Sequence, residues 1–195
     1  IEECMIVANE TVASAFFHRD IPFIYRIHDC PTDEKILDLA ELIAPFGYTL
    51  SHNMADVRPY HFQKLLDKIE DRPEKSLLEL MVLRTMSHAF YGTENRGHFG
   101  LASKFYCHFT SPIRRYPDLQ IHRIIKENLH GKLNDKRIQH YQTILSEVAG
   151  QCSRTERRAE EAERETEKMK KAEYMYQKAR FLQDLSIQER ISTYM

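Results

Sequence analysis

The chain reads YCHFTSPIRRYPDL at residues 106–119, and this segment says more about the protein than any other. The Ser111-Pro112 pair favours an extended backbone, and Pro117 suits the first turn of a helix. Arg114 and Arg115 therefore lie on a short connection between two prolines, which limits their freedom. Arginine stays charged at every relevant pH, and its planar donors match two phosphate oxygens. The segment predicts a turn that leads into a helix and offers guanidinium groups to a phosphodiester.

A second interpretation of the arginine pair is equally good on these residues alone. Asp118 lies close by in the sequence, so the arginines could form an ordinary surface ion pair with it. Tyr116 likewise packs against protein more often than it stacks on a nucleic-acid base. The residues by themselves leave both a phosphate site and a structural ion pair open.

Length and composition favour one domain with a buried core. The chain has 195 residues, of which 42% are hydrophobic and 29% are charged, an ordinary balance for a soluble protein. No apolar run approaches the roughly 18 residues that a membrane span needs, and no secretion signal is readable, so we expect a cytoplasmic protein without a membrane partner. The formal net charge of −1 gives no overall attraction for polyanions, so any nucleic-acid contact has to be local.

The residue types that bind metals do not show the spacing of a metal site. The cysteines, Cys4, Cys30, Cys107 and Cys152, lie far apart without a C-x-x-C pair, which argues against a zinc site and a disulfide framework. We expect reduced, buried thiols. None of the ten histidines occurs in H-x-x-x-H or H-E-x-x-H spacing, so the sequence predicts no metal ligands in this chain.

Helical periodicity dominates the chain. Apolar residues recur at intervals of three and four over several stretches, and glycines or prolines mark their ends. Residues 23–27 are rich in strand formers, and residues 101–109 suit a short strand pair or an extended segment. We expect an α+β fold dominated by helices, with a small β contribution. The expected helices cover residues 2–17, 33 to about 46, a stretch that starts near 59 and includes Ile69, 73–91 and 117–130, and a last one starts near residue 134 and is interrupted at Gly150.

The last expected helix is strongly charged. Residues 155–180 hold seven acidic and eight basic side chains, with a narrow stripe of small and apolar residues between them. Such a pattern is typical of a solvated or coiled-coil-like helix. We therefore expect a long charged helix at the C-terminal end.

Five blocks of sequence, in the same order, resemble the catalytic (RNB) domain of bacterial ribonuclease R in the ribonuclease II family. They are IEECMIVAN at residues 1–9, YRIHDCP at 25–31, GHFGLA at 97–102, the segment at 106–119, and TERRAE at 155–160. The resemblance extends from residue 1 to about residue 174. It implies that residues 1–175 form the C-terminal part of such a catalytic domain, and it leaves residues 176–195 as a tail of unassigned structure.

The resemblance implies an activity that this chain does not carry alone. Members of the family hydrolyse RNA processively from the 3′ end and release nucleoside 5′-monophosphates, in a manner similar to two-metal phosphoryl transfer. The metal-binding carboxylates come from an aspartate cluster upstream of the Glu-Glu-x-Met block, and no such cluster occurs here. We therefore expect Mg²⁺ to be bound mainly by residues absent from this chain, and the isolated chain to be inactive. The implied partners are RNA, the upstream half of the domain and flanking oligonucleotide-binding domains, with the oligomeric state open.

The resemblance also assigns roles within the arginine segment. The first arginine of the family's Ser-Pro-Ile-Arg motif contacts the region of the scissile phosphate, which makes Arg114 the candidate catalytic residue. Arg115 is a weaker candidate, for substrate binding, and Ser111 and Tyr116 in the same block are further candidates for contact with RNA. His108 belongs to this block too, where a neutral imidazole could donate to a phosphate or simply hold the loop.

Two glutamates outside this segment are candidates for substrate binding. The family has a functional acid in the Glu-Glu-x-Met block, near the 3′ end of bound RNA, which favours Glu3. On the residues alone, an acid at a helix start would only complement the helix dipole. Glu163 matches a glutamate near the catalytic centre of some family members, although its surroundings also suit an ordinary solvated helix. Asn9 and His28 are interpreted as structural residues.

Two alternatives to an active nuclease remain open. A non-catalytic helical module could use the Arg114-Arg115 turn to bind RNA or an acidic protein surface. A degenerate relative could keep the fold without the metal site. An aspartate cluster upstream in the reading frame would favour the nuclease, whereas a start codon at this boundary would favour the binding module.

Overall fold

The computed structural model describes the backbone of residues 1–50 and 57–193, and the side chains among them up to Arg180. The chain divides into two compact units, Ile1–Cys152 and Ser153–Met195. Helices dominate the described part and a two-stranded sheet completes it, which confirms the expected helix-dominated α+β class. None of the described helices is both long enough and apolar enough to cross a membrane.

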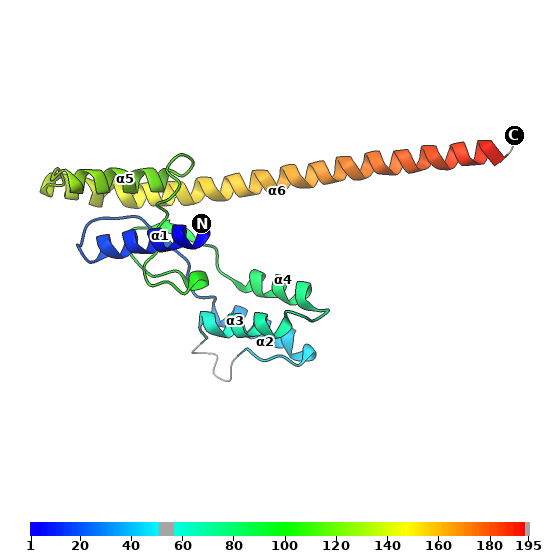
Figure 1. Ribbon diagram of the computed structural model, residues 1–195, viewed down its shortest axis with the longest axis horizontal. Helices are drawn as coiled ribbons and strands as arrows, with labels where there is room; N and C mark the ends of the chain where they lie inside the picture. Colours follow the sequence, from blue (N-terminus) through cyan, green and yellow to red (C-terminus); the bar gives the residue numbers. More distant parts are fainter. Residues whose placement is uncertain (51–56, 194–195) are drawn as a thin grey trace. The chain divides into compact units, whose positions relative to one another are not determined.

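The elements follow one another along the chain as Figure 1 shows. The strands are β1 (Tyr25–Ile27) and β2 (Phe90–Gly92), and the short 3₁₀ helices are η1 (Ala44–Phe46) and η3 (Phe99–Leu101). The α-helices are α1 (Glu2–Phe17), α2 (Asp33–Ile43), α3 (Pro59–Ile69), α4 (Lys75–Thr85), α5 (Tyr116–Leu129) and α6 (Asp135–Thr193).

The sheet pairs two strands that lie far apart in the sequence. β1 and β2 run antiparallel, with Tyr25 opposite Gly92 and Ile27 opposite Phe90. The strand expected at residues 23–27 is therefore confirmed in a shorter form.

The helix expected over residues 73–91 is wrong at its C-terminal end, over residues 86–91. α4 ends at Thr85, and the backbone becomes extended at Met86. Phe90 and Tyr91 are good strand formers, and their pairing with β1 overrides the helical periodicity of the sequence before them.

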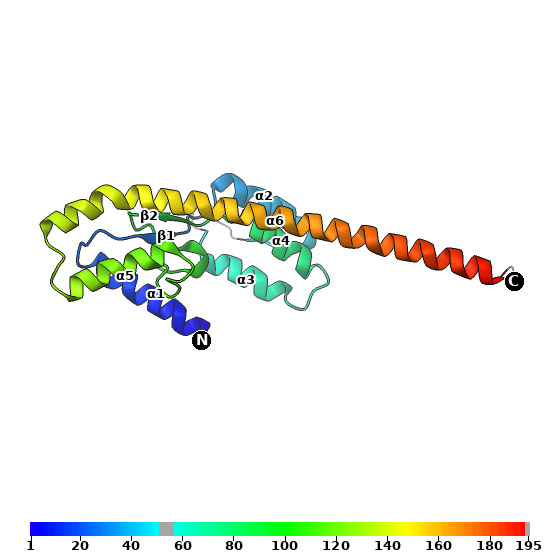
Figure 2. The ribbon, with the colours of Figure 1, turned by 90° about the horizontal axis from the view of Figure 1, so that it is seen from above.

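The first core cluster joins α1, β1, α5 and the beginning of α6. Its buried residues are Ala13, Phe16, Phe23, Ile24, Tyr25, Ile27, Tyr91, Cys107, Ile121, Ile124, Tyr141, Leu145 and Ala149. α5 and the beginning of α6 lie side by side in both ribbon views (Figure 1, Figure 2). Arg137 of α6 ties them together, since its Nη2 donates to Glu127 Oε1 at 2.8 Å and to the Tyr141 hydroxyl at 2.9 Å. This packing gives α5 a fixed position in the first unit.

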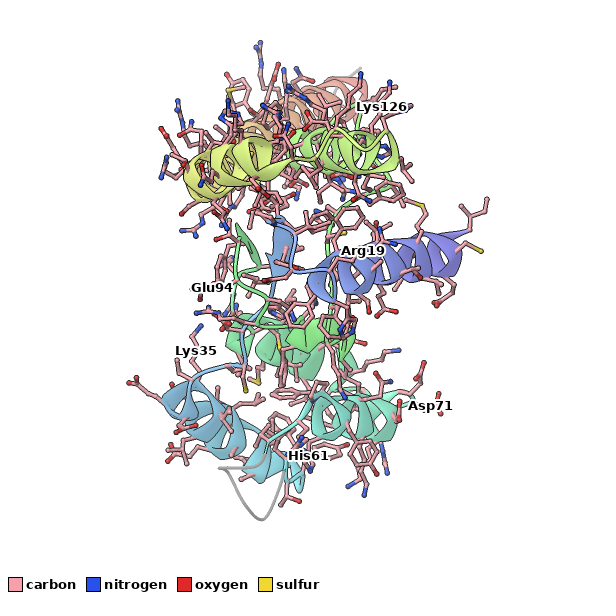
Figure 3. All side chains as sticks on the ribbon, turned by 90° about the vertical axis from the view of Figure 1, so that its left-hand side faces the viewer. Arg19, Lys35, His61, Asp71, Glu94 and Lys126 are labelled. Atoms are coloured by element: carbon pink, nitrogen blue, oxygen red, sulfur yellow. The ribbon has the colours of Figure 1, made fainter. Side chains whose placement is uncertain are left out.

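The second core cluster joins α2, α3 and α4. Its buried residues are Ile36, Leu39, Ile43, Leu50, Val57, Phe62, Leu65, Ile69, Leu78 and Val82. Thr32 caps α2, since its hydroxyl accepts a hydrogen bond from the Lys35 amide at 3.5 Å, and Pro59 opens α3. Charged side chains such as Lys35 and Asp71 point outward (Figure 3). The three helices therefore bury their apolar faces against one another.

α6 runs without interruption from Asp135 to Thr193, so the break expected at Gly150 is wrong. A glycine inside a helix costs only about 1 kcal/mol relative to alanine. Ala149 beside it is buried in the first core cluster, and this packing outweighs the cost. Side chains from residue 157 to Arg180 are exposed, as expected for the charged helix, and residues 176–193, which the resemblance left unassigned, continue the same helix. Its ion pairs include Lys168–Glu165, Lys170–Glu173 and Lys171–Glu167.

All four cysteines are free thiols, but their burial differs. Cys107 is buried, Cys152 is partly exposed, and Cys4 and Cys30 are exposed. The expectation that all four are buried is therefore wrong, because Cys4 lies on the open side of the first turn of α1 and Cys30 lies in the connection before α2. Burial raises the pKa of the Cys107 thiol and keeps it protonated.

Candidate nucleic-acid interface

The Arg114 turn, residues 111–115, connects an extended segment to α5. The amides of Arg114 and Arg115 both donate to the carbonyl of Ser111, at 3.3 and 3.1 Å. α5 begins at Tyr116 and has Pro117 in its first turn, as the sequence predicts. The two arginines therefore lie on a closed turn at the start of a helix that is packed in the first core cluster.

A buried carboxylate fixes this turn. Asp118 is fully buried, and its Oδ2 accepts hydrogen bonds from the Ser111 amide at 2.8 Å, from Arg115 Nε at 3.1 Å and from Arg115 Nη2 at 2.7 Å. The side chain of Arg115 is only 17% exposed, and this charge-assisted pairing holds it in one orientation. An ion pair with Asp118, one of the two alternatives that the sequence left open, therefore forms at Arg115, but its carboxylate is buried and not at the surface. Asp118 Oδ1 and Thr110 Oγ1 are also buried, without a hydrogen-bond partner among the described residues.

Arg114 differs from its neighbour. Its side chain is exposed, and its guanidinium forms no hydrogen bond or ion pair with another residue in the described parts of the chain. Ile113 beside it is 100% exposed, and Tyr116 is 50% exposed. A cation without a protein partner is available to an anionic ligand, and the apolar side chains next to it offer surface for a sugar or a base.

Asn9 fastens the segment that leads to the turn onto α1. Its Nδ2 donates to the Tyr106 hydroxyl at 3.1 Å, and its Oδ1 accepts from the Phe109 amide at 3.0 Å. Its main-chain carbonyl lies 3.3 Å from Cys107 Sγ, which donates to it. Asn9 is buried, so these bonds are shielded from water. The structural interpretation of Asn9 is confirmed.

His28 organises the loop around η3. Its Nδ1 accepts from the Gly100 amide at 2.8 Å, so the ring hydrogen is on Nε2 and is donated to the Ser87 carbonyl at 2.7 Å. A Cβ at position 100 would lie 2.7 Å from His28 Nδ1, so this close approach requires glycine. The structural interpretation of His28 is confirmed. Burial, followed by the influence of His28 and Arg26, lowers the pKa of neighbouring His98 to about 4.

His108 precedes the turn and lies near both arginines. Its Nδ1 is 2.9 Å from the hydroxyl of Tyr91 on β2. Burial, followed by the charges of Arg115 and Arg26, lowers the pKa of His108 to about 3, so the imidazole is neutral at neutral pH. Arg114 contributes to the same lowering of the pKa. His108 lies three residues before Ser111, in the segment that leads into the Arg114 turn.

The two predicted glutamates lie on other elements. Glu3 is exposed in the first turn of α1, and Glu163 is exposed on α6 in the second unit. The sequence indicated Asp118 only as a possible ion-pair partner of the arginines and not as a site residue. Nothing in the sequence around Tyr91 marks that residue.

The described residues contain no group of three or more His, Cys, Asp or Glu side chains placed to hold a metal ion. Asp118, the acid of the turn, already accepts hydrogen bonds from Ser111 and Arg115. These residues therefore do not fit a magnesium site. The exposed guanidinium of Arg114 instead suits an anionic ligand.

Comparison with known proteins assigns the chain to a family. The model of the RNB domain family matches residues 1–131, and the chain belongs to that family. It is 46% identical over 179 residues to ribonuclease R of Thermotoga maritima, which covers 90% of this chain and 25% of that protein. It is 43% identical over 183 residues to ribonuclease R of Escherichia coli, which covers 90% of this chain and 22% of that protein. The chain spans about a quarter of the length of these relatives.

Two solved structures extend the comparison. Mycoplasma genitalium ribonuclease R in complex with ribose-methylated single-stranded RNA matches with a TM-score of 0.79 and 32% identity, over 84% of this chain and 26% of that chain. Yeast Ssd1, a pseudonuclease, matches with a TM-score of 0.65 and 25% identity, over 77% of this chain and 18% of that chain. The resemblance to ribonuclease R that the sequence blocks indicated is confirmed.

Proposed function

We propose that this chain forms the RNA-contacting part of a 3′-to-5′ exoribonuclease that hydrolyses RNA to nucleoside 5′-monophosphates. The observation that carries the proposal is the guanidinium of Arg114, which has no partner among the described residues and is held on a turn that Asp118 fixes from within the protein. Membership of the RNB family and similarity to proteins named ribonuclease R support the same conclusion. The Mycoplasma relative was solved with RNA bound, which supports RNA as the ligand.

Arg114 is the proposed catalytic residue. A guanidinium that is already in place when RNA binds stabilises the negative charge that develops on the scissile phosphate without further reorganisation. Arg115 is committed to Asp118, so its role is to hold the turn and add positive potential. Ser111 supports the turn through its amide and carbonyl, while Tyr116 and Glu3 offer exposed side chains to the RNA.

The proposed reaction requires Mg²⁺, which carboxylates outside the described residues would hold. No three candidate ligands gather among the residues that the structure describes, and the chain spans only part of its relatives. We therefore propose that the isolated chain binds RNA but does not hydrolyse it. The residues described above bind and orient the backbone, and the metal ions would activate the water.

Replacing Arg114 tests this proposal in the complete polypeptide that carries the chain. With a uniformly labelled RNA and Mg²⁺, Arg114→Ala should lower kcat/KM by a factor of about 10² to 10³, or about 3–4 kcal/mol, the usual effect of losing one preorganised donor. Arg84→Ala removes an exposed arginine from the last turn of α4 and should leave kcat/KM within about twofold. Equal mononucleotide release by the Arg114→Ala variant and the unaltered polypeptide would exclude the catalytic role.

A non-catalytic RNA-binding module is the second candidate. The similarity to yeast Ssd1, a pseudonuclease, shows that this fold also occurs without nuclease action. In that case the complete polypeptide would bind RNA with the same dependence on Arg114 but release no mononucleotides on addition of Mg²⁺. Mononucleotide release that stops with EDTA distinguishes the nuclease from the binding module.

A further inference from the structure

Among the described residues, one ring nitrogen of His108 has a hydrogen-bond partner and the other has none. Nδ1 is 2.9 Å from the Tyr91 hydroxyl. Nε2 has no hydrogen-bond partner among the described residues, and it is not among the side-chain atoms that are both fully enclosed and unpaired. The ring therefore has one hydrogen-bonding atom left for a ligand.

Tyr91 is held firmly enough to orient this ring. Its side chain is 5% exposed and lies in the first core cluster. On the paired strand, Arg26 is directly opposite Tyr91, and its guanidinium carbon lies 4.6 Å from the centre of the Tyr91 ring. The rings of Tyr91 and His108 meet edge to face, with centroids 5.6 Å apart. The Tyr91 hydroxyl, on a side chain held by the packing of β2, thus contacts the His108 imidazole in a fixed position.

The hydroxyl of Tyr91 also decides where the imidazole carries its hydrogen. A phenol is a better donor than acceptor, and an unprotonated imidazole nitrogen is a strong acceptor, so the favoured bond runs from the Tyr91 O–H to His108 Nδ1. The single hydrogen of the neutral ring is then on Nε2. Protonation of Nδ1 would break this bond and add a third positive charge beside Arg114 and Arg115, which agrees with the lowered pKa of His108.

We infer that His108 Nε2 donates a hydrogen bond to an oxygen of the RNA backbone next to the phosphate held by Arg114, and that Tyr91 is the positioning residue that keeps the hydrogen there. The inference rests on the proposed contact of the Arg114 turn with RNA, but not on hydrolysis. The acceptor is a second phosphate oxygen or a ribose 2′-hydroxyl, since each can accept a hydrogen bond from a neutral N–H.

Amide substitutions separate this role from simple packing. In glutamine the amide nitrogen can occupy the place of Nε2, whereas in asparagine it reaches only the place of Nδ1. Binding of a fluorescent single-stranded RNA to the complete polypeptide, measured by anisotropy without metal ions, should weaken roughly 3- to 10-fold for His108→Ala. His108→Gln should recover most of this loss and His108→Asn should not. His140→Gln, at an exposed histidine of α6, is the matched control and should bind as the unaltered polypeptide does.

A double-variant comparison tests Tyr91. Tyr91→Phe should weaken binding when position 108 is histidine, because the hydrogen is then free to move to Nδ1. The same change should have no further effect in His108→Gln, since an amide needs no tautomer partner. Tyr60→Phe, at an exposed tyrosine of α3, controls for loss of a hydroxyl, and thermal melts confirm that each variant folds. Equal losses from Tyr91→Phe in both backgrounds would contradict the positioning role.

Single 2′-deoxy substitutions along the RNA identify the acceptor. If it is a 2′-hydroxyl, one deoxy position should weaken binding to the unaltered polypeptide but not to His108→Ala. If it is a phosphate oxygen, every deoxy position should affect both proteins equally. Binding of His108→Ala within twofold of the unaltered polypeptide, or no advantage of glutamine over asparagine, would overturn the inference. The hydrolysis assay tests the proposed function separately. That function fails if the complete polypeptide releases no mononucleotides, or if the Arg114→Ala variant hydrolyses RNA as fast as the unaltered polypeptide does.

Discussion

At the scale of single residues, Arg114 and Arg115 are neighbours with opposite environments. Arg115 is paired with a buried carboxylate, while Arg114 is exposed and has no partner among the described side chains. The buried pair fixes the geometry of the turn, and this leaves the second cation free for a ligand. Stability and RNA contact are thus assigned to different arginines of one motif.

Asp118 should therefore contribute strongly to stability. Asp118→Ala leaves the Arg115 guanidinium and the Ser111 amide without their acceptor, and we expect a loss of about 3–5 kcal/mol in the free energy of unfolding. Asp118→Asn keeps the shape and one acceptor oxygen, so its loss should be about 1–3 kcal/mol. Asp135→Ala, at an exposed acid in the first turn of α6, should cost less than about 1 kcal/mol. Urea unfolding measures all three, and equal midpoints for Asp118→Ala and Asp135→Ala would contradict this account.

The sequence could predict the turn and its helix, but not which arginine pairs with Asp118 and which one stays exposed. Pro112 and Pro117 restrict the backbone locally, so their effect is readable from neighbouring residues alone. Which arginine reaches Asp118 depends on the dihedral angles inside the turn. The ion pair and the phosphate site appeared as alternatives in the sequence, whereas the structure contains the ion pair at Arg115 and leaves Arg114 for the proposed phosphate site.

At the scale of elements, α1 supports the approach to the turn through one side chain. Asn9→Ala would leave the Phe109 amide and the Tyr106 hydroxyl without their partner. We expect a loss of about 2–3 kcal/mol in unfolding free energy and weaker RNA binding, because residues 106–109 lose their anchor. Thr11→Ala, at an exposed position of α1 whose hydroxyl bonds only within the helix, should change stability by less than about 0.5 kcal/mol. Chemical denaturation and RNA titration of both variants check this, and equal behaviour of the two would refute it.

Two helix boundaries differ from those that the local sequence pattern predicts. The helix expected up to residue 91 ends at Thr85, because Phe90 and Tyr91 pair with a strand more than sixty positions earlier in the sequence. The break expected at Gly150 does not occur, because Ala149 and its neighbours are packed. In both cases a distant contact outweighs a local preference of about 1 kcal/mol. Tyr91 reaches His108 for the same reason, so this part of the candidate site was not readable from the sequence.

At the scale of the whole molecule, two partly buried histidines that are neutral in the folded state make stability depend on pH. The pKa of His98 is lowered to about 4 and that of His108 to about 3, whereas an unfolded chain titrates near 6.5. Below about pH 6.5 the unfolded state binds more protons than the folded state, so stability should fall as the pH drops towards 4 and should not change above 6.5 through these groups. Urea midpoints between about pH 7 and pH 4.5 measure this, and His108→Gln should reduce the slope. A slope that is the same in the variant would contradict the environment assigned to His108.

The most direct test of the central claim, that Arg114 grips a phosphate of the RNA backbone, is the salt dependence of RNA binding. Each phosphate contact to a single strand contributes about −0.7 to the slope of log K against log salt concentration. Arg114→Ala should make this slope shallower by about 0.7, while Arg84→Ala should leave it unchanged. Identical slopes for Arg114→Ala and the unaltered polypeptide would show that Arg114 does not contact a phosphate.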